Sequence, residues 1–163
     1  MQSVCGPACA MKVARKVAEK KDKKETKLKL DALQTKPQLV KKAQAAVNAY
    51  IRARDAGKPC ISCGAPLSDE PNSADAGHFR SVGSAPHMRF CELNCWAQCK
   101  KCNRHLSGNA VEYRKRLLER IGLERLEQLE SDNVLRKYTK EGLEEIARHY
   151  RAEARRLKKE RLE

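Results

Sequence analysis

Residues 60–109 read CISCGAPLSDEPNSADAGHFRSVGSAPHMRFCELNCWAQCKKCNRHLSGN, and this stretch predicts the centre of the fold. Two Cys-x-x-Cys pairs, Cys60/Cys63 and Cys99/Cys102, bracket it. Each pair lets two thiolates converge on one ion, and two pairs supply the four sulfur ligands of a tetrahedral zinc site. Because four protein ligands leave no open coordination position, we expect this zinc to be structural.

The distance between the two cysteine pairs indicates that the zinc holds another element in place. The 35 residues between Cys63 and Cys99 exceed the usual gap of a zinc ribbon. This segment contains Asp75, Gly77, His78 and Asn94, and Asn103 directly follows the second pair. The sequence therefore predicts a loop or hairpin that is stapled by zinc and carries these polar side chains.

Positive charge is concentrated in the first part of the chain. The formal net charge is +14, and residues 1–58 hold 15 Lys/Arg against 5 Asp/Glu. Residues 59–110 hold 5 against 4, and residues 111–163 hold 15 against 12. A basic arm beside a nearly neutral centre is typical of phosphate-backbone contacts with a nucleic acid. The alternative interpretation is that the Lys-rich helices are only solvated faces.

The composition predicts a small core and a reducing compartment. Aromatic residues make up only 4% of the chain, so the core depends on a bound metal for part of its stability. The paired spacing of the cysteines argues against a secreted disulfide scaffold. The sequence shows no apolar run long enough for a signal peptide or a membrane span. We therefore expect a cytoplasmic protein with no membrane association.

Several short motifs resemble those of one known family. PCISCG, DAGHF, FCELN, QCKKCN and SGN, with QAAVNAYIRARD before them and YRKRLLERIG after them, resemble the NinG/Rap recombination endonucleases of lambdoid phages. The likeness runs from about residue 26 to the C-terminus. More distantly, the cysteine pairs around an Asp/His element are similar to phage endonuclease VII and the HNH (ββα-metal) nucleases. The resemblance implies a phage- or prophage-encoded endonuclease that cuts Holliday junctions and other branched DNA in the bacterial cytoplasm.

The same resemblance implies a role for each polar residue of the centre. His78 would be the general base, a task that suits an imidazole because it titrates near neutral pH. Asp75 and Asn103 would bind a catalytic Mg²⁺ or Mn²⁺, ions that prefer oxygen ligands. Asn94 would correspond to the middle Asn of HNH and hold the loop that orients the histidine.

One position departs from the HNH pattern. Those enzymes carry a metal-binding Asp or His directly before the base, where this chain has Gly77. Asp75 lies three residues before His78, and on a regular strand the two would point to opposite faces. We therefore expect a turn or bulge at Gly77. Without it, Asp75 is a turn residue and His78 is itself a candidate metal ligand.

Basic residues around the motif are the candidate phosphate contacts. They are Arg80, Arg89, Lys100, Lys101 and Arg104. Symmetrical cutting of two strands requires two sites, so we expect a homodimer formed through the apolar stripes of the long helices. The alternative is a non-catalytic zinc-containing module that binds DNA or RNA, which explains the cysteines and the charge equally well.

The predicted architecture is α+β and mostly helical, with a small zinc-stapled, HNH-like ββα-metal centre flanked by long basic helices. Cys5 and Cys9 in residues 1–9 suggest part of a cysteine knuckle. A basic helical arm over 10–35 and an amphipathic helix over 36–58 precede the centre at 59–110, and residues 111–163 form a C-terminal helical region. Within the centre we expect short strands over 78–82 and 87–91 and a helix from about Cys99.

Overall fold

The computed structural model describes residues 6–68, 70, 73–161 and 163. The chain divides into two compact units, of which the first ends at Gln38 and the second comprises Leu39–Glu163. Cys5 lies outside the described residues, and so does the knuckle predicted from it. Each unit is described by itself below.

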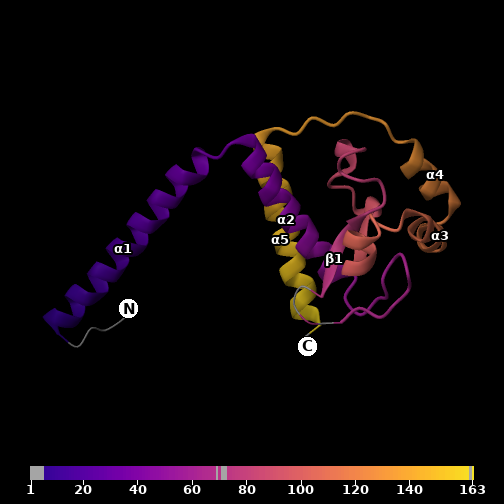
Figure 1. Cartoon of the computed structure of the whole chain (residues 1–163). Helices are drawn as coiled ribbons and strands as arrows, with labels where there is room; N and C mark the ends of the chain where they lie inside the picture. The colour runs from indigo at the N-terminus through magenta and orange to yellow at the C-terminus, as the bar shows by residue number, and fades with distance from the viewer. Residues whose placement is uncertain (1–5, 69, 71–72, 162) are drawn as a thin grey trace. The chain divides into compact units, whose positions relative to one another are not determined.

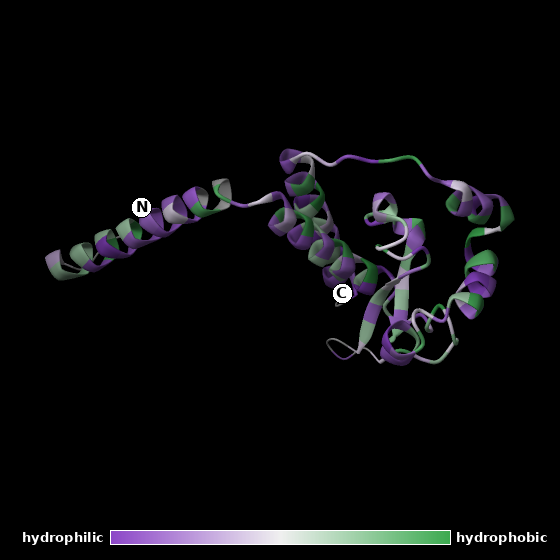
Figure 2. Cartoon of the chain, turned by 45° about the horizontal axis from the view of Figure 1, so that its top comes forward, coloured by the Kyte–Doolittle hydropathy of each residue, from purple (hydrophilic) through white to green (hydrophobic). Residues whose placement is uncertain are grey.

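The first unit is dominated by helix α1 (Pro7–Ala32), in the region where the sequence predicts a helical arm over 10–35. Its Ala, Lys and Glu residues favour helix, and Arg15–Glu19 and Glu25–Lys29 form ion pairs one turn apart. Apolar side chains such as Met11 and Val17 are exposed. Hydrophilic residues occupy much of this helix (Figure 2). Intrahelical propensity and ion pairs therefore stabilise α1 more than burial does.

In the second unit, helices α2 (Lys36–Arg54) and α5 (Lys140–Glu160) lie side by side and run in the same direction (Figure 1). They bury one core, with Leu39, Ala43, Ala46, Val47 and Ile51 from α2 and Leu143 and Ala147 from α5. The Tyr50 and Tyr150 rings stand 5.0 Å apart at this contact. The sequence predicts an amphipathic helix over 36–58; α2 ends at Arg54, and its apolar side chains lie in this core.

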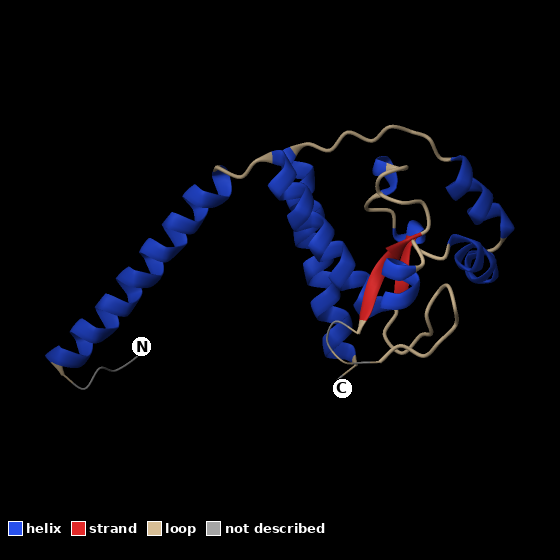
Figure 3. Ribbon diagram, viewed as in Figure 1, coloured by secondary structure: helices blue, strands red, loops and turns tan. Residues whose placement is uncertain are grey.

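A two-stranded antiparallel sheet lies beside these helices (Figure 3). Strand β1 (Ala74–His78) pairs with β2 (Cys95–Cys99), and His78 stands opposite Cys95. The strands predicted over 78–82 and 87–91 are wrong, because residues 79–94 form a loop with short 3₁₀ turns at Pro86–Met88 and Glu92–Asn94. The Asn94 side chain hydrogen-bonds both the N–H and the carbonyl of Arg80. It thereby takes the backbone groups that a continuing strand would have paired.

The predicted bulge at Gly77 is also wrong. The pairing of β1 with β2 is continuous from Ala74 to His78, so Asp75 and His78 lie on opposite faces of the ladder. A Cβ at Gly77 would collide with the Oε1 atom of Gln98 on β2. Glycine therefore leaves room here for the Gln98 side chain, which lies against it, and is not needed for a turn.

Helical segments follow the second strand, which makes the described part of the chain mostly helical with one small sheet. Lys101–His105 form a π-helical turn, followed by α3 (Ala110–Ile121) and α4 (Leu123–Ser131). A second core joins these helices to the loops of the centre through Ile61, Ala85, Met88, Tyr113, Leu117, Leu126 and Leu129. Thr139 caps α5 by accepting a hydrogen bond from the Gly142 N–H. Among the described helices, none is both long and apolar enough to span a membrane.

Candidate functional site

The first cysteine pair lies in a tight turn anchored to the sheet. The Gly64 N–H donates to the Cys60 carbonyl at 2.9 Å, and Gly64 adopts a left-handed conformation that favours glycine. The Ile61 N–H donates to the Ala97 carbonyl of β2 at 3.0 Å. This backbone bond fixes the turn against the strand that ends in the second pair.

The second pair joins the end of β2 to the π-helical turn. Cys99 is the last residue of the strand, and the Cys102 N–H donates to its sulfur at 3.4 Å. The Asn109 side-chain amide lies 3.7 Å from the Cys102 sulfur. Strand, turn and the start of α3 therefore position these two thiols together.

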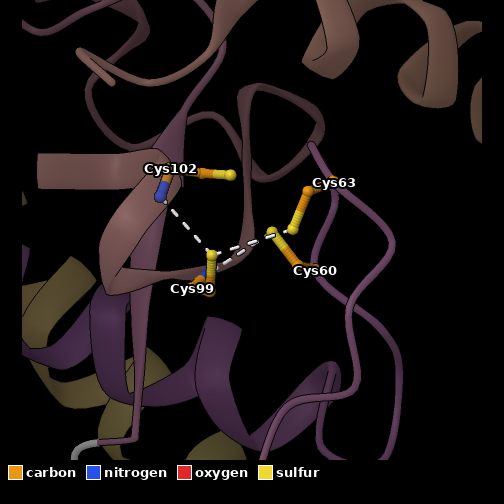
Figure 4. A group of neighbouring side chains, drawn as sticks. All are labelled: Cys60, Cys63, Cys99 and Cys102. Carbon is orange, nitrogen blue, oxygen red and sulfur yellow. Dashed lines mark hydrogen bonds between the residues drawn. The ribbon is translucent and has the colours of Figure 1, made fainter. Parts of the chain in front are cut away.

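The four sulfur atoms converge in space, as the sequence predicts (Figure 4). All four lie within 4.8 Å of one another, and Cys63 Sγ is 3.8 Å from Cys99 Sγ. A tetrahedral zinc with bonds of about 2.3 Å places its sulfur ligands roughly 3.8 Å apart. Burial raises the pKa of the Cys60 thiol, but donated backbone N–H bonds outweigh burial and lower this pKa to about 7. The cluster thus fits a structural zinc ion.

A buried carboxylate directly after α2 supports this centre and was not predicted from the sequence. Asp55 is 1% exposed and accepts a hydrogen bond from the Ala97 N–H of β2 at 3.0 Å. Arg54 pairs with Asp55 at 2.8 Å and donates to the Cys95 carbonyl, while its guanidinium stacks 4.2 Å from the Trp96 ring. The structure shows that Arg54 and Asp55 fasten α2 to β2.

A polar cluster lies next to the cysteines and includes three of the predicted site residues. The Asn103 side-chain amide donates to Asp75 Oδ2 at 2.9 Å. Arg104 donates to both carboxylate oxygens of Asp75, at 2.7 and 2.8 Å. Hydrogen bonds from Arg104 hold the pKa of Asp75 below its usual range, and the Asn103 amide acts in the same direction. We call Asp75, Asn103 and Arg104 the Asp75 cluster.

The Asp75 cluster, as it is arranged, does not fit a divalent cation. Asp75 and Asn103 supply the oxygen atoms that Mg²⁺ and Mn²⁺ prefer. However, a bidentate guanidinium neutralises the carboxylate, and the Asn103 amide donates to one of the same oxygens. A cation could coordinate Asp75 only after Arg104 has moved.

His78 lies on the other face of the ladder. Its Nε2 atom is 3.0 Å from the Arg89 carbonyl, which can only accept, so Nε2 carries the proton and Nδ1 keeps its lone pair. The nearest described contact of Nδ1 is Cys95 Sγ at 4.0 Å. Burial lowers the pKa of His78, so the ring is neutral at pH 7. The structure thus presents an oriented, neutral imidazole, but it does not bring this ring to Asp75 or Asn103.

Asn94, predicted to hold the loop that orients the histidine, is the last residue of the short 3₁₀ turn before β2. It is fully buried, and its amide also donates to the Met88 carbonyl at 3.3 Å. The Phe79 N–H donates to the Asn94 backbone carbonyl at 2.8 Å. These bonds fix the loop that begins directly after His78 and contains Arg89, the hydrogen-bond partner of the imidazole.

The five predicted phosphate contacts separate into two groups. Lys100, Lys101 and Arg104 are exposed around the π-helical turn. Arg80, in contrast, donates to the Leu129 and Asp132 carbonyls and to the Asn133 side chain. Its guanidinium therefore holds the end of α4, and its predicted role as a phosphate contact does not agree with this position. Arg89 is partly buried and lies 3.5 Å from the Gln44 side chain.

Comparison with known proteins identifies the family. Residues 1–160 match the family NinG, described as "Bacteriophage Lambda NinG protein". The chain is 41% identical to protein ninG of Salmonella phage P22, covering 98% of this chain and 86% of that protein. It is 40% identical to protein ninG of Escherichia phage lambda, covering 98% and 85%. No solved structure matches this chain significantly. The chain belongs to the NinG family of bacteriophage proteins.

Proposed function

We propose that this NinG protein is a structure-specific endonuclease that hydrolyses phosphodiester bonds in Holliday junctions and other branched DNA. The observation that carries the proposal is the state of His78, a neutral ring whose Nε2–H is held by the Arg89 carbonyl and whose Nδ1 can accept a proton. The motifs of the centre, which resemble those of the NinG/Rap recombination endonucleases, supply the substrate class. The four-cysteine cluster would provide a rigid scaffold for His78 and for the loop that contains Arg89.

In the proposed reaction, His78 acts as the general base. Its Nδ1 atom takes a proton from water as the water oxygen bonds to phosphorus and the opposite P–O bond breaks. The Arg89 carbonyl keeps the ring in one orientation and stabilises the imidazolium that forms. Asn94 contributes indirectly, since it fixes the loop that carries this carbonyl. Mg²⁺ or Mn²⁺ would supply charge stabilisation at the phosphate, and Asp75 and Asn103 would hold the ion only after Arg104 had moved away from the carboxylate.

Exposed basic residues would hold the DNA beside the centre. Lys100 and Lys101 project from the turn that carries Asn103, and α1 adds a long row of lysines. Such contacts with the phosphate backbone are independent of base sequence, as recognition of a branched shape requires. Cutting two strands of a junction symmetrically needs two centres, so we propose that the active species is a homodimer.

The test is cleavage of a labelled four-way junction in Mg²⁺ or Mn²⁺ by wild type and His78→Ala. Loss of a general base should reduce the rate by about 10²–10⁴-fold. Junction affinity measured by fluorescence anisotropy without divalent cation should stay within about twofold, because a neutral imidazole adds no charge contact with the phosphate backbone. The matched control is His105→Ala, an exposed histidine on the neighbouring turn, which should cleave normally. Unchanged cleavage by His78→Ala would exclude the proposed role.

The arrangement of the sheet favours one rival, a non-catalytic zinc-containing module that binds DNA or RNA. His78 and Asp75 lie on opposite faces of a regular ladder, and Arg104 occupies the carboxylate. The same experiment separates the two functions. If zinc-loaded wild type binds the junction but does not cut it in Mg²⁺ or in Mn²⁺, the binding module is correct and the endonuclease is not.

A further inference from the structure

One side of α5 carries a row of charged side chains whose sign changes along the helix. Residues three and four positions apart on a helix are neighbours, so members at alternating spacings of three and four form a continuous row. Its members are Glu141, Glu144, Arg148, Arg151, Arg155 and Lys158. All are exposed except Arg151, which is partly buried. The C-terminal half of α5 therefore presents four cations in succession, and no acidic residue interrupts them within the row.

The carboxylates in this half of α5 are already paired with a different arginine. Arg156 pairs with Glu153 at 2.9 Å and with Glu160 at 2.7 Å. Such alternating pairs are typical of a helix face that is merely solvated. In the described part of the chain, by contrast, three members of the row form no ion pair: Arg151, Arg155 and Lys158. The row thus differs from the neighbouring face in having cations that no carboxylate neutralises.

The helix dipole does not account for the arginines of the row. Cations are favourable near the C-terminus of a helix, but the effect falls off within the last turn. Lys158 lies in the last turn of α5, whereas Arg148, Arg151 and Arg155 precede it. Arg148 lies 3.6 Å from Glu145, and the two side chains are 75% and 73% exposed, so this pair contributes little to stability. The three arginines are therefore available to an anionic partner outside the chain.

We propose that this row binds the phosphate backbone of a duplex DNA arm, with Arg148, Arg151 and Arg155 as its central contacts. The inference rests on the DNA-binding part of the proposed function and adds a contact surface on the unit that holds the sulfur cluster. Arginine matches a phosphate with its planar, bidentate fork. At 1.5 Å per residue the three positions span about 10 Å, over which one DNA strand carries about three phosphates.

The row ends near the other exposed cations of this unit. Arg104 pairs with Asp75, so the turn that also carries Lys100 and Lys101 lies beside the start of β1. The C-terminal end of α5 and the start of β1 lie at the same end of the second unit (Figure 1). Phosphates attracted by α5 and by the turn therefore approach the same end of this unit.

The salt dependence of junction binding by the zinc-loaded protein tests the row. Wild type and Arg148→Gln/Arg151→Gln/Arg155→Gln are titrated into a labelled four-way junction without divalent cation, and Kd is measured by fluorescence anisotropy at several NaCl concentrations. If all three contacts are lost, the slope of log affinity against log salt should fall in magnitude by roughly 2.7, at about 0.9 per contact. At about 0.1 M salt the Kd should rise more than about tenfold, because fewer counterions are released on binding.

The matched control removes three exposed cations that already have carboxylate partners. Arg114→Gln/Lys115→Gln/Arg136→Gln lowers the net charge by the same amount, and its slope should stay close to that of wild type. Melting temperature and zinc content should match wild type in both variants, because the substituted groups form no ion pairs with buried residues.

Three results would overturn the proposal. They are a slope in the α5 variant as steep as in wild type, an equal loss in the control variant, which net charge alone would explain, and no junction affinity of wild type at low salt. Cleavage is a separate readout. If wild type binds the junction but never cuts it, the endonuclease proposal fails, whereas the α5 surface is still decided by the slope.

Discussion

At the scale of single residues, hydrogen-bond partners decide what a side chain can do. The type of residue at His78 suggests a base, but only the Arg89 carbonyl assigns the proton to Nε2. Asp75 likewise has the right chemistry for a cation, yet Arg104, which follows it by 29 positions, occupies its oxygens. Arg80, predicted to contact phosphate, instead binds backbone carbonyls at the end of α4. Each of these partners is distant in the sequence.

The lowered pKa of His78 makes a prediction about stability. Burial shifts the folded-state pKa below the ordinary value of 6.5, so the unfolded chain binds the proton first as pH falls. The contribution of neutral His78 to the free energy of unfolding is therefore fully present above pH 6.5. It is lost as the pH drops from 6.5 through the pKa that His78 has in the folded state. His78→Gln removes this dependence. The free energy of unfolding of wild type and of His78→Gln is measured in urea from pH 7.5 to 5. Below pH 6.5 wild type should lose stability relative to His78→Gln. A difference between the two proteins that stays constant over this range would contradict the prediction.

At the scale of elements, contacts from the cysteine turns, α3 and the end of α2 hold the two short strands in place. The two cysteine turns belong to different parts of the chain, and a zinc ion would join them to each other and to β2. Tyr113 of α3 reinforces the same strand pair by donating its hydroxyl to the Gly77 carbonyl at 2.9 Å. Arg54, the last residue of α2, and the adjacent Asp55 bind β2 as well, at the Cys95 carbonyl and the Ala97 N–H. The five-residue strands thus depend on partners outside the ladder.

Loss of the zinc should unfold this centre. Cys99→Ser removes one of the four sulfur ligands, and structural zinc contributes on the order of 10–16 kcal/mol in small domains whose folding depends on it. We expect the variant to lose about one zinc per chain relative to wild type, as measured by atomic emission, and to lose the cooperative thermal transition. Cys91→Ala, which removes a thiol outside the cluster, is the matched control and should retain its zinc. Full zinc content in Cys99→Ser would contradict the assignment.

At the scale of the whole molecule, stability and charge reside in different units. Both core clusters are built from residues between Leu39 and Ala147, within the second unit. The first unit is mainly an exposed helix with basic side chains along its length. Residues of α1 are absent from both core clusters of the described part of the chain, and we propose that its basic side chains bind a charged partner.

Neutralising part of α1 should weaken DNA binding without changing the fold. Replacing the exposed residues Lys20, Lys21, Lys23 and Lys24 with Gln removes four positive charges. If all four contact phosphates, the slope of log affinity against log salt should fall in magnitude by roughly 3.6, at about 0.9 per contact. Melting temperature and zinc content should not change, because these side chains are exposed. An unaltered slope in a salt titration would show that α1 does not contact the DNA.

The sequence by itself determined the features whose physics is local. Each Cys-x-x-Cys spacing predicts one half of the four-sulfur cluster, and the period of apolar residues predicts the buried face of α2, because both depend on near neighbours along the chain. Tertiary structure alone decided the position of the strands, the regular pairing at Gly77, the burial of Asp55 and the partner of Asp75. The strands are short, and Asn94 competes for the backbone groups of the loop between them, so periodicity could not locate them. Partners such as Arg104 come together only through packing between distant segments, which sequence spacing does not encode.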